Sequence, residues 1–455
     1  MKNWLPENLP YVRLPTAKIS RISLSPPAVL ALGFLGLIML GTLLLLLPFA
    51  TTAPITLLQA LFTATSAVTV TGLVVVDTGS QFSQFGQIVI ALLIQAGGLG
   101  FMTFAVVAAV SLGAKIGLSQ QKIAQEALGQ TSLAQVTTIA KAVLLYALVI
   151  ELIGVMLLTL TWWSELGFTT ALYHGFFYTI SAFNNAGFAL SSNSLMPYVG
   201  SIPVNLIITG LFIIGGIGFT VLIDVKKQKR WQLLSTNTKV IILATLLINL
   251  GAFILIWLLE ANNPATLQQL SIKDQALAAW FQAVTPRTAG FNTLDYSNMT
   301  DASNILTLLL MFIGGGSLST ASGIKLGTFV ILLMATYAFL RRRDEVTVMK
   351  RTVPTQLVLK ALALALVSMI TIFISIFLLT ITEQAPLLDV AFEVVSALST
   401  VGLSRGLTGE LSTFGQLLII VLMITGRLGP LTLAYFLATP KRRRIRYADT
   451  RIQVG

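Results

Sequence analysis

The 455-residue chain contains no cysteine, a single histidine and few charged residues, which make up 10% of it. Without cysteine, neither disulfides nor thiolate chemistry are available, and the redox compartment is not readable. One histidine and few acids in apolar segments give no convincing catalytic triad or metal centre, so an enzyme is disfavoured. The glycine-rich stretches lie inside apolar runs, so we do not interpret them as nucleotide-binding loops.

Hydrophobic residues, in contrast, make up 55% of the chain, and the mean hydropathy is +0.86. This composition is typical of a membrane protein with several spans, each needing about 20 apolar residues. The first apolar stretch is too long for the core of a secretory signal, so no cleavage is expected. The eight predicted spans are roughly 27–49, 83–110, 139–161, 203–224, 238–259, 304–338, 357–381 and 414–438.

The net charge of +12 is distributed unevenly. Of 29 Lys and Arg residues, 24 fall on one side of the predicted spans, and only Lys273, Arg287 and Arg405 fall on the other. This is the positive-inside pattern, so both termini are predicted to be cytoplasmic. The placement argues for a multi-pass membrane protein and against nucleic-acid binding.

One pattern occurs four times along the chain. A short helix-like stretch ends at a lone glycine, and a second glycine patch follows 24 to 28 residues later, within an apolar span. The lone glycines are Gly72, Gly187, Gly290 and Gly402. The second patches begin at Gly97, Gly215, Gly314 and Gly426. Four equivalent pieces in one membrane chain suggest a ring around a central pore.

Each repeat is predicted to contain a span, a short outer helix that enters the membrane and returns, and a second span. The short helices are Pro54–Ser66, Thr169–Ser181, Ser271–Thr285 and Pro386–Ser396, which are too short to cross a bilayer. An ordinary outer loop with a glycine turn is the alternative. The fold prediction is an all-α polytopic protein with four pore repeats about a pseudo-fourfold axis. Its parts are an N-terminus (1–26), repeats 27–110, 139–224, 238–338 and 357–438, and a C-terminal tail (439–455).

The repeated glycines suggest a cation path. A short helix whose C-terminus points at the axis directs the negative end of its dipole there. Glycine permits backbone angles that turn carbonyl oxygens inward, where they can replace the water shell of a cation. The four glycine motifs contain no carboxylate, so a dehydrated monovalent cation fits better than a divalent one.

The single-glycine loops, the eight spans and the glycine-rich break in the third repeat resemble the Trk/Ktr/HKT superfamily of potassium transporters. The short N-terminus is most similar to the KtrB branch, the membrane subunits of bacterial Ktr systems. The resemblance covers about residues 27–440. It implies channel-like potassium uptake, stimulation by sodium, a homodimer in the bilayer, and regulation by a cytosolic KtrA-like subunit. No cofactor is expected in this chain, and the nucleotide is expected only on that partner.

The resemblance assigns a selectivity filter to the four glycines. Each is preceded by a residue whose carbonyl belongs to the same loop. The predicted potassium-binding residues are Thr71, Gly72, Ala186, Gly187, Ala289, Gly290, Val401 and Gly402.

The third repeat departs from the pattern. Its second apolar stretch, 304–338, would be too long as one straight helix, and its middle is rich in glycine and small hydroxyl residues. We interpret residues 314–327 as an unwound intramembrane loop that acts as a gate, whereas a tilted helix with small residues for close packing is the alternative. The predicted gate residues are Gly314, Gly315, Gly316, Ser317, Ser319, Thr320, Ser322, Gly323, Lys325 and Arg427.

Arg427 belongs to this set because it falls near the middle of the last span, where a charge is costly. A fixed positive charge in a cation path is a barrier, whereas an arginine satisfied by backbone carbonyls is the structural alternative. We interpret Glu151 as a structural partner rather than an ion ligand, and His174 as a packed outer residue.

A competing functional class is an alternating-access cation symporter, since such carriers also contain broken helices and internal repeats. Those repeats are usually two inverted halves. Four repeats in the same direction favour one continuous pore.

Overall fold

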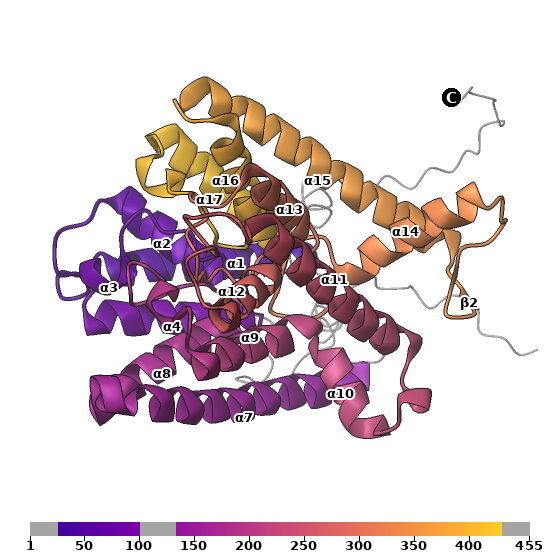
Figure 1. The fold of residues 1–455 in the computed structure, drawn as a ribbon, viewed down its shortest axis with the longest axis horizontal. Coiled ribbons are helices and arrows are strands. Elements are labelled where there is room, and N and C mark those ends of the chain that lie inside the picture. The colour runs from indigo at the N-terminus through magenta and orange to yellow at the C-terminus, as the bar shows by residue number, and fades with distance from the viewer. Residues whose placement is uncertain (1–25, 101–132, 430–455) are drawn as a thin grey trace, which may run out of the picture.

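The computed structural model describes residues 26–100 and 133–429, and this part of the chain is predominantly helical (Figure 1). The predicted N-terminus, the segment 101–132 and the C-terminal tail lie outside the described residues, as do the ends of the spans 83–110 and 414–438. The longer helices are α1 (Pro26–Leu45), α4 (Gln84–Gly98), α7 (Leu133–Leu166), α9 (Ile202–Ile217), α10 (Phe219–Gln228), α11 (Thr236–Glu260), α13 (Asp301–Phe312), α14 (Leu326–Leu340), α15 (Thr355–Thr382) and α17 (Thr413–Leu428).

Four short helices lie between the long ones, where the sequence predicted them. They are α2 (Leu57–Thr69), α8 (Phe168–Phe183), α12 (Ile272–Val284) and α16 (Leu387–Ser399). The minor elements are α3 (Thr78–Gln81), η1 (Met196–Tyr198), η2 (Trp231–Leu233), η3 (Leu407–Glu410) and a hairpin of β1 (Thr347–Val348) and β2 (Arg351–Thr352). In that hairpin, Thr347 pairs with Thr352.

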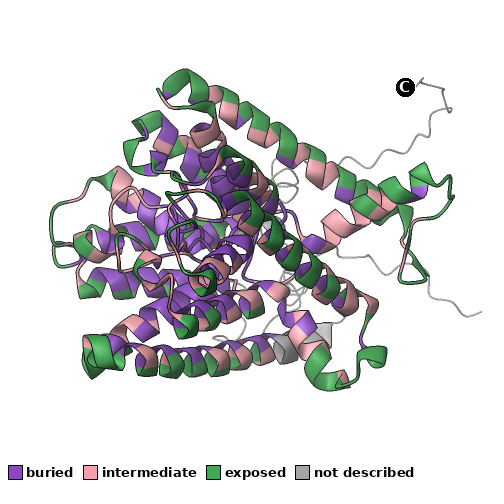
Figure 2. Cartoon of the chain, in the orientation of Figure 1, coloured by how far each residue is buried: buried purple, intermediate pink, exposed green. Residues whose placement is uncertain are grey.

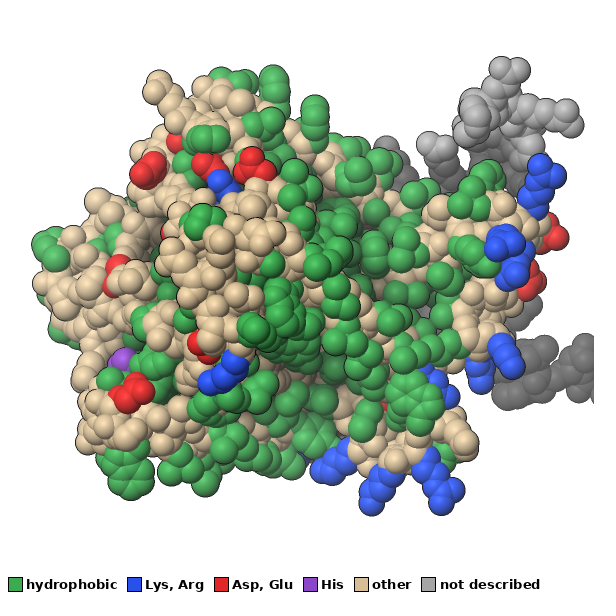
Figure 3. All heavy atoms as spheres, viewed as in Figure 1, with side chains coloured by type: hydrophobic (Ala, Val, Ile, Leu, Met, Phe, Trp, Pro, Cys, Tyr) green, Lys and Arg blue, Asp and Glu red, His purple; other side chains and the backbone are tan. Residues whose placement is uncertain are grey.

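Within residues 26–100 and 133–429, three helical segments are each long and apolar enough to cross a bilayer, namely Ala140–Leu166, Thr236–Glu260 and Thr355–Thr382. Large apolar side chains on them face outward, with Leu247 67% and Phe373 73% exposed, as expected of a surface that lipid covers. Figure 3 shows Lys and Arg side chains gathered at the end of the molecule near α10 and the hairpin, and most acidic ones in view at the other end.

Two predicted spans are broken in the structure. The stretch 203–224 was expected to be one helix, but α9 and α10 meet at Gly218 with a bend of 92°. Gly218 has a φ of +109°, which a residue with a Cβ rarely adopts, so the glycine permits the bend. The stretch 304–338 is divided into α13 and α14, with residues 313–325 between them in no helix.

The four short helices form the buried centre of the molecule (Figure 2). Every residue in the second half of each is buried, apart from Phe176 and Trp280, which are half-buried. Each also packs against the second helix of the preceding unit, in the pairs α4–α8, α9–α12, α13–α16 and α17–α2. Because the last pair joins the end of the chain to its beginning, these contacts close a circle.

Candidate functional site

The four predicted glycines all lie in loops directly after the short helices. Their φ angles are +94° at Gly72, +69° at Gly187, +79° at Gly290 and +91° at Gly402. Positive φ is the region that glycine adopts without steric cost, so each loop uses its glycine for the same backbone reversal. The C-termini of α2, α8, α12 and α16 point into these loops, and their helix dipoles place negative potential there.

A second conformational feature recurs two residues before each glycine. The residues at this position have left-handed backbone, with φ between +49° and +70°, and they are Val70, Asn185, Thr288 and Thr400. Three of the four are β-branched, for which this conformation is unfavourable by about 1–3 kcal/mol. Such strain persists only where surrounding contacts determine the backbone, and it clusters at functional sites. Sequence reasoning missed this feature, because β-branched residues predict the opposite conformation.

Hydroxyl side chains from the last turn of each short helix hold the loops. In the first and fourth loops, Ser66 and Ser396 accept a hydrogen bond from the glycine amide, at 3.0 Å and 3.1 Å. In the second and third, Ser181 and Thr285 instead donate to the carbonyl of the residue after the glycine. The loops are thus fixed by alternative hydrogen bonds from equivalent helix ends.

The four loops meet one another in a ring. A Cβ placed on each glycine would collide with backbone of the next loop along the chain. A Cβ on Gly72 would meet the carbonyl oxygen of Ala186, and one on Gly402 would meet that of Thr71. A Cβ on Gly187 would lie 2.7 Å from Cα of Gly290, and one on Gly290 would lie 2.5 Å from the carbonyl oxygen of Val401. Ala289 contributes its carbonyl oxygen 3.1 Å from the Cβ position of Gly187. All eight predicted filter residues are therefore brought together.

A cavity of about 300 Å³ opens on the ring, and all four glycines line it. Among the described residues that line it, Asp77 carries the one charge, and serine, threonine and asparagine supply the other polar side chains. Asp77 also caps α3, since its carboxylate accepts from the amide and hydroxyl of Ser80. The cavity is therefore polar and weakly acidic, which suits a path for cations.

The second glycine patches serve close packing. In the first, second and fourth repeats, a Cβ on the patch glycine would overlap a backbone carbonyl at the end of the preceding short helix. The pairs are Gly97 with Val68, Gly215 with Phe183, and Gly426 with Leu398. In each pair, the carbonyl belongs to the residue four positions before the ring glycine. The patch therefore lets the second helix support the ring from behind.

The third repeat breaks this arrangement. Gly314 contacts the carbonyl of Ser322 within its own loop rather than a short helix. The loop lies on the end of α9 through three backbone hydrogen bonds. These are Gly316 N to Gly216 O at 2.8 Å, Thr320 N to Gly215 O at 3.2 Å, and Phe219 N to Leu318 O at 2.9 Å. The loop therefore spans from its own repeat to the second one.

Side chains attach the same loop to the ring and to other repeats. Thr320 donates to Asn185 Oδ1 at 2.8 Å, one of the four left-handed residues. Ser319 donates to the carbonyl of Gly316, and Lys325 to that of Ala321 at 2.6 Å. The predicted gate residues from Gly314 to Lys325 thus form one segment beneath the ring.

Arg427 joins this segment to the first repeat from the end of α17. Its guanidinium donates to the carbonyl of Thr320 and, at 3.2 Å, to the hydroxyl of Ser322. It also donates to the carbonyls of Gly97 and Gly98. Backbone oxygens from two repeats therefore hold the charge, with no carboxylate among the partners that the described residues provide.

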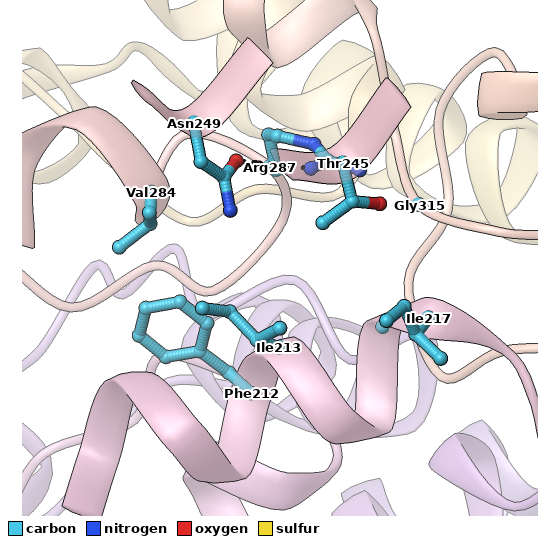
Figure 4. A pocket seen from close by; sticks show the side chains of 9 residues that line it. Phe212, Ile213, Ile217, Thr245, Asn249, Val284, Arg287 and Gly315 are labelled. Carbon is cyan, nitrogen blue, oxygen red and sulfur yellow. Dashed lines mark hydrogen bonds between the residues drawn. The ribbon is translucent and has the colours of Figure 1, made fainter. Parts of the chain in front are cut away.

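Arg287 was counted among the outer charges in the sequence analysis, but the structure places it inside the fold. It is partly buried between α11 and the third ring loop, and it donates to Asn249 Oδ1 at 3.0 Å and to the carbonyl of Gly314 at 3.5 Å. Figure 4 shows this pair beside a small pocket, across from Phe212 and Ile213 on α9. Only its position three residues before Gly290 could have suggested a connection between loop and ring.

Glu151 and His174, which were interpreted from the sequence as structural residues, both make contacts inside the fold. Glu151 accepts hydrogen bonds from Gln95 at 3.0 Å and Asn184 at 3.3 Å, which joins the first two repeats. His174 packs among Trp162 and Tyr178. Sequence reasoning missed Glu393, a fully buried carboxylate that accepts from Ser404 at 2.9 Å and from Thr408.

Comparison with known proteins places this geometry in a family. Residues 30–445 match the TrkH family, described as cation transport proteins. The chain belongs to the TrkH family. Its fold also resembles the crystal structure of the potassium transporter TrkH from Vibrio parahaemolyticus, with a TM-score of 0.74 over 94% of this chain and 87% of that one. The identity there is 21%, so this likeness concerns the fold alone.

Relatives within the family align along nearly their whole length. The Ktr system potassium uptake protein B of Bacillus subtilis (strain 168) is 50% identical over 96% of this chain and 98% of its own. The protein of the same name from Vibrio alginolyticus is 44% identical over 97% and 98%. The potassium/sodium uptake protein NtpJ of Enterococcus hirae is 36% identical over 96% and 98%.

Proposed function

We propose that this chain is the membrane subunit of a Ktr-type potassium uptake system, and that potassium crosses through the ring of Gly72, Gly187, Gly290 and Gly402. The closed circle of contacts between the four loops is the observation that carries the proposal, because a ring of backbone carbonyls can replace the hydration shell of a cation. The four short helices add negative potential at that point. The names of the aligned relatives support potassium as the ion.

The arrangement is best explained as four pore repeats about a pseudo-fourfold axis. The circle of helix pairs and the repeated glycine geometry both support it. Each loop contributes one glycine, so few coordinating layers are stacked. Rejection of sodium is therefore expected to be weaker than in a filter with several carbonyl rings, and NtpJ carries both ions in its name.

The loop between α13 and α14 is proposed as the gate. It lies where the other three repeats place a patch glycine against a short helix, and Arg427 adds a positive charge beside it. A cation barrier follows from that charge unless the loop moves. We further propose sodium stimulation, a homodimer, both termini in the cytoplasm of a bacterial cell, and a KtrA-like nucleotide-binding partner. The words "Ktr system" in the relatives' names support such a partner.

A pore and an alternating-access symporter make different predictions in a reconstituted membrane. The purified protein, fused into a planar bilayer with a potassium gradient and no sodium, should pass a current that reverses at the potassium equilibrium potential. Gly290→Ser should move the reversal potential when sodium is added on one side. Saturable flux without unitary current, or coupling to a second ion that displaces the reversal potential, would favour the symporter.

A further inference from the structure

A short basic segment follows the bend after α9. We name it the basic arm and define it by six of its exposed residues, namely Lys226, Lys227, Lys229, Arg230, Trp231 and Leu233. Trp231 is 47% and Leu233 60% exposed, and both come just after the four cations in the chain. Figure 3 shows the blue side chains of this region projecting from the end of the molecule.

The bend gives the basic arm a defined direction. Since α9 packs along the other long helices, the 92° angle turns α10 nearly perpendicular to them (Figure 1). A helix perpendicular to a span lies along the bilayer surface rather than across it. Tryptophan prefers this interfacial zone, with its ring at headgroup level.

The charges of the basic arm are not neutralised locally. Asp224, the acid on α10, is occupied by Ser235 N at 3.0 Å and Thr238 Oγ1, which join α10 to the start of α11. Within residues 26–100 and 133–429, none of the four cations forms an ion pair, and Lys226 instead lies over the ring of Tyr146. Four cations beside an exposed tryptophan match a surface of anionic lipid headgroups.

The basic arm is also connected to the loop under the ring. Phe219, the first residue of α10, donates its amide to Leu318 O at 2.9 Å. At Gly218, a Cβ would lie 2.5 Å from the carbonyl oxygen of Ser317. The backbone at the bend is therefore in direct contact with the middle of the loop, so any movement of α10 changes the support of that loop.

We propose that the basic arm binds anionic lipid headgroups of the bilayer, and that this binding biases the loop 313–325 through the bend at Gly218. The second half of the proposal rests on the proposed gating function, whereas the first half does not. The headgroups that fit are those of anionic phospholipids. A free polyanion would not account for the exposed tryptophan in the same segment, and the orientation of α10 perpendicular to the long helices favours the bilayer surface over a protein partner.

The lipid half is tested by fluorescence of the purified protein in nanodiscs, with no partner present. The chain has six tryptophans, so the signal of Trp231 is obtained as the difference from Trp231→Phe. Brominated phosphatidylglycerol should quench this signal more than brominated phosphatidylcholine does. In the variant K226Q/K227Q/K229Q/R230Q, the apparent affinity for phosphatidylglycerol should fall by about fivefold for each cation that is neutralised. The preference for this lipid should also weaken as salt is added. Arg341→Gln with Arg343→Gln, directly after α14, is the matched control and should keep this preference.

The coupling half is tested by rubidium uptake into proteoliposomes that differ only in their phosphatidylglycerol content. Wild-type flux should change with that content, the quadruple variant should not respond, and deletion of residues 317–321 should abolish the response. Equal quenching by both lipids would overturn lipid recognition whatever the flux. Selective quenching with a flux that ignores lipid content would overturn the coupling. Absence of flux in every lipid would instead count against the proposed function and leave the quenching result in force.

Discussion

The loops after the four short helices are alike, whereas the helices behind them are not. Every loop has a left-handed residue, a glycine two positions later, and a hydroxyl from its own helix that fixes it. Behind the loops, three repeats place a glycine against the preceding short helix, and the third places a loop. Coordination of an ion at an axis requires four equivalent groups, whereas an obstruction needs only one. In the proposed function, this difference separates the four loops that select the ion from the one loop that blocks its path.

The largest effect is expected from shortening the loop of the third repeat. Deletion of residues 317–321 removes the contacts to Gly215 and Asn185. If the closed state dominates, with an open population of about 0.1–10%, rubidium uptake should rise at least about tenfold. The ratio of potassium to sodium affinity should stay near that of wild type, because the ring is untouched.

Ser317→Ala is the matched control for this deletion, since the Ser317 side chain is exposed and makes no hydrogen bond in the described structure. Uptake should be compared at equal abundance in the membrane. A deletion variant that transports no faster than wild type would reject the gate and leave a packing role for the loop.

A second substitution changes the ring and leaves the loop of the third repeat intact. Gly290→Ser introduces a Cβ at a φ of +79°, 2.5 Å from the carbonyl oxygen of Val401. The backbone of both loops must shift, so the preference for potassium over sodium should fall roughly tenfold, or about 1.4 kcal/mol. This preference is measured by how strongly potassium and sodium each compete with rubidium uptake. Gly409→Ala is the control, because Gly409 lines the same cavity with open space at its Cβ position. Unchanged affinities for both ions in Gly290→Ser would remove the ring from its proposed role.

The short helices and their glycines could be predicted from the sequence, whereas the strained loop residues, the bend at Gly218 and the depth of Arg287 could not. The short helices and their glycines follow from lone glycines at matching offsets, since a Cβ at these four positions would collide with the backbone of the neighbouring loop. The left-handed Val70 and Thr400 were not predictable, because local preference opposes them and the contacts of neighbouring loops decide the outcome. The bend at Gly218 was missed because its apolar pattern continues through it. Arg287 was misplaced because a position in the sequence does not give the depth of a side chain in the fold.

A smaller effect is expected at Arg427, where two variants separate charge from hydrogen bonding. Arg427→Gln removes the positive charge and keeps a donor, whereas Arg427→Lys keeps the charge and loses the paired contacts to Thr320 and Gly97. If the charge is the barrier, only the glutamine variant should speed uptake, by about three- to tenfold. Equal acceleration in both variants would assign Arg427 to holding the loop, and loss of folded protein in both would assign it to stability.

The smallest effect should come from Arg287, which joins the ring loop of the third repeat to the broken span. Its contact with Gly314 O is long, at 3.5 Å, and Asn249 orients the guanidinium from α11 at 3.0 Å. Arg287→Lys cannot make both contacts at once, because an ammonium lacks the planar fork. A hydrogen bond of this kind contributes about 0.5 kcal/mol, so the loop should open about two- to threefold more often and uptake should rise by that factor. Asn249→Ala leaves the arginine in place and removes its support, so it should act in the same direction by a similar amount. If both variants transport at the wild-type rate while deletion of residues 317–321 speeds uptake, the gate works without a connection to the ring, and the two halves of the third repeat are independent.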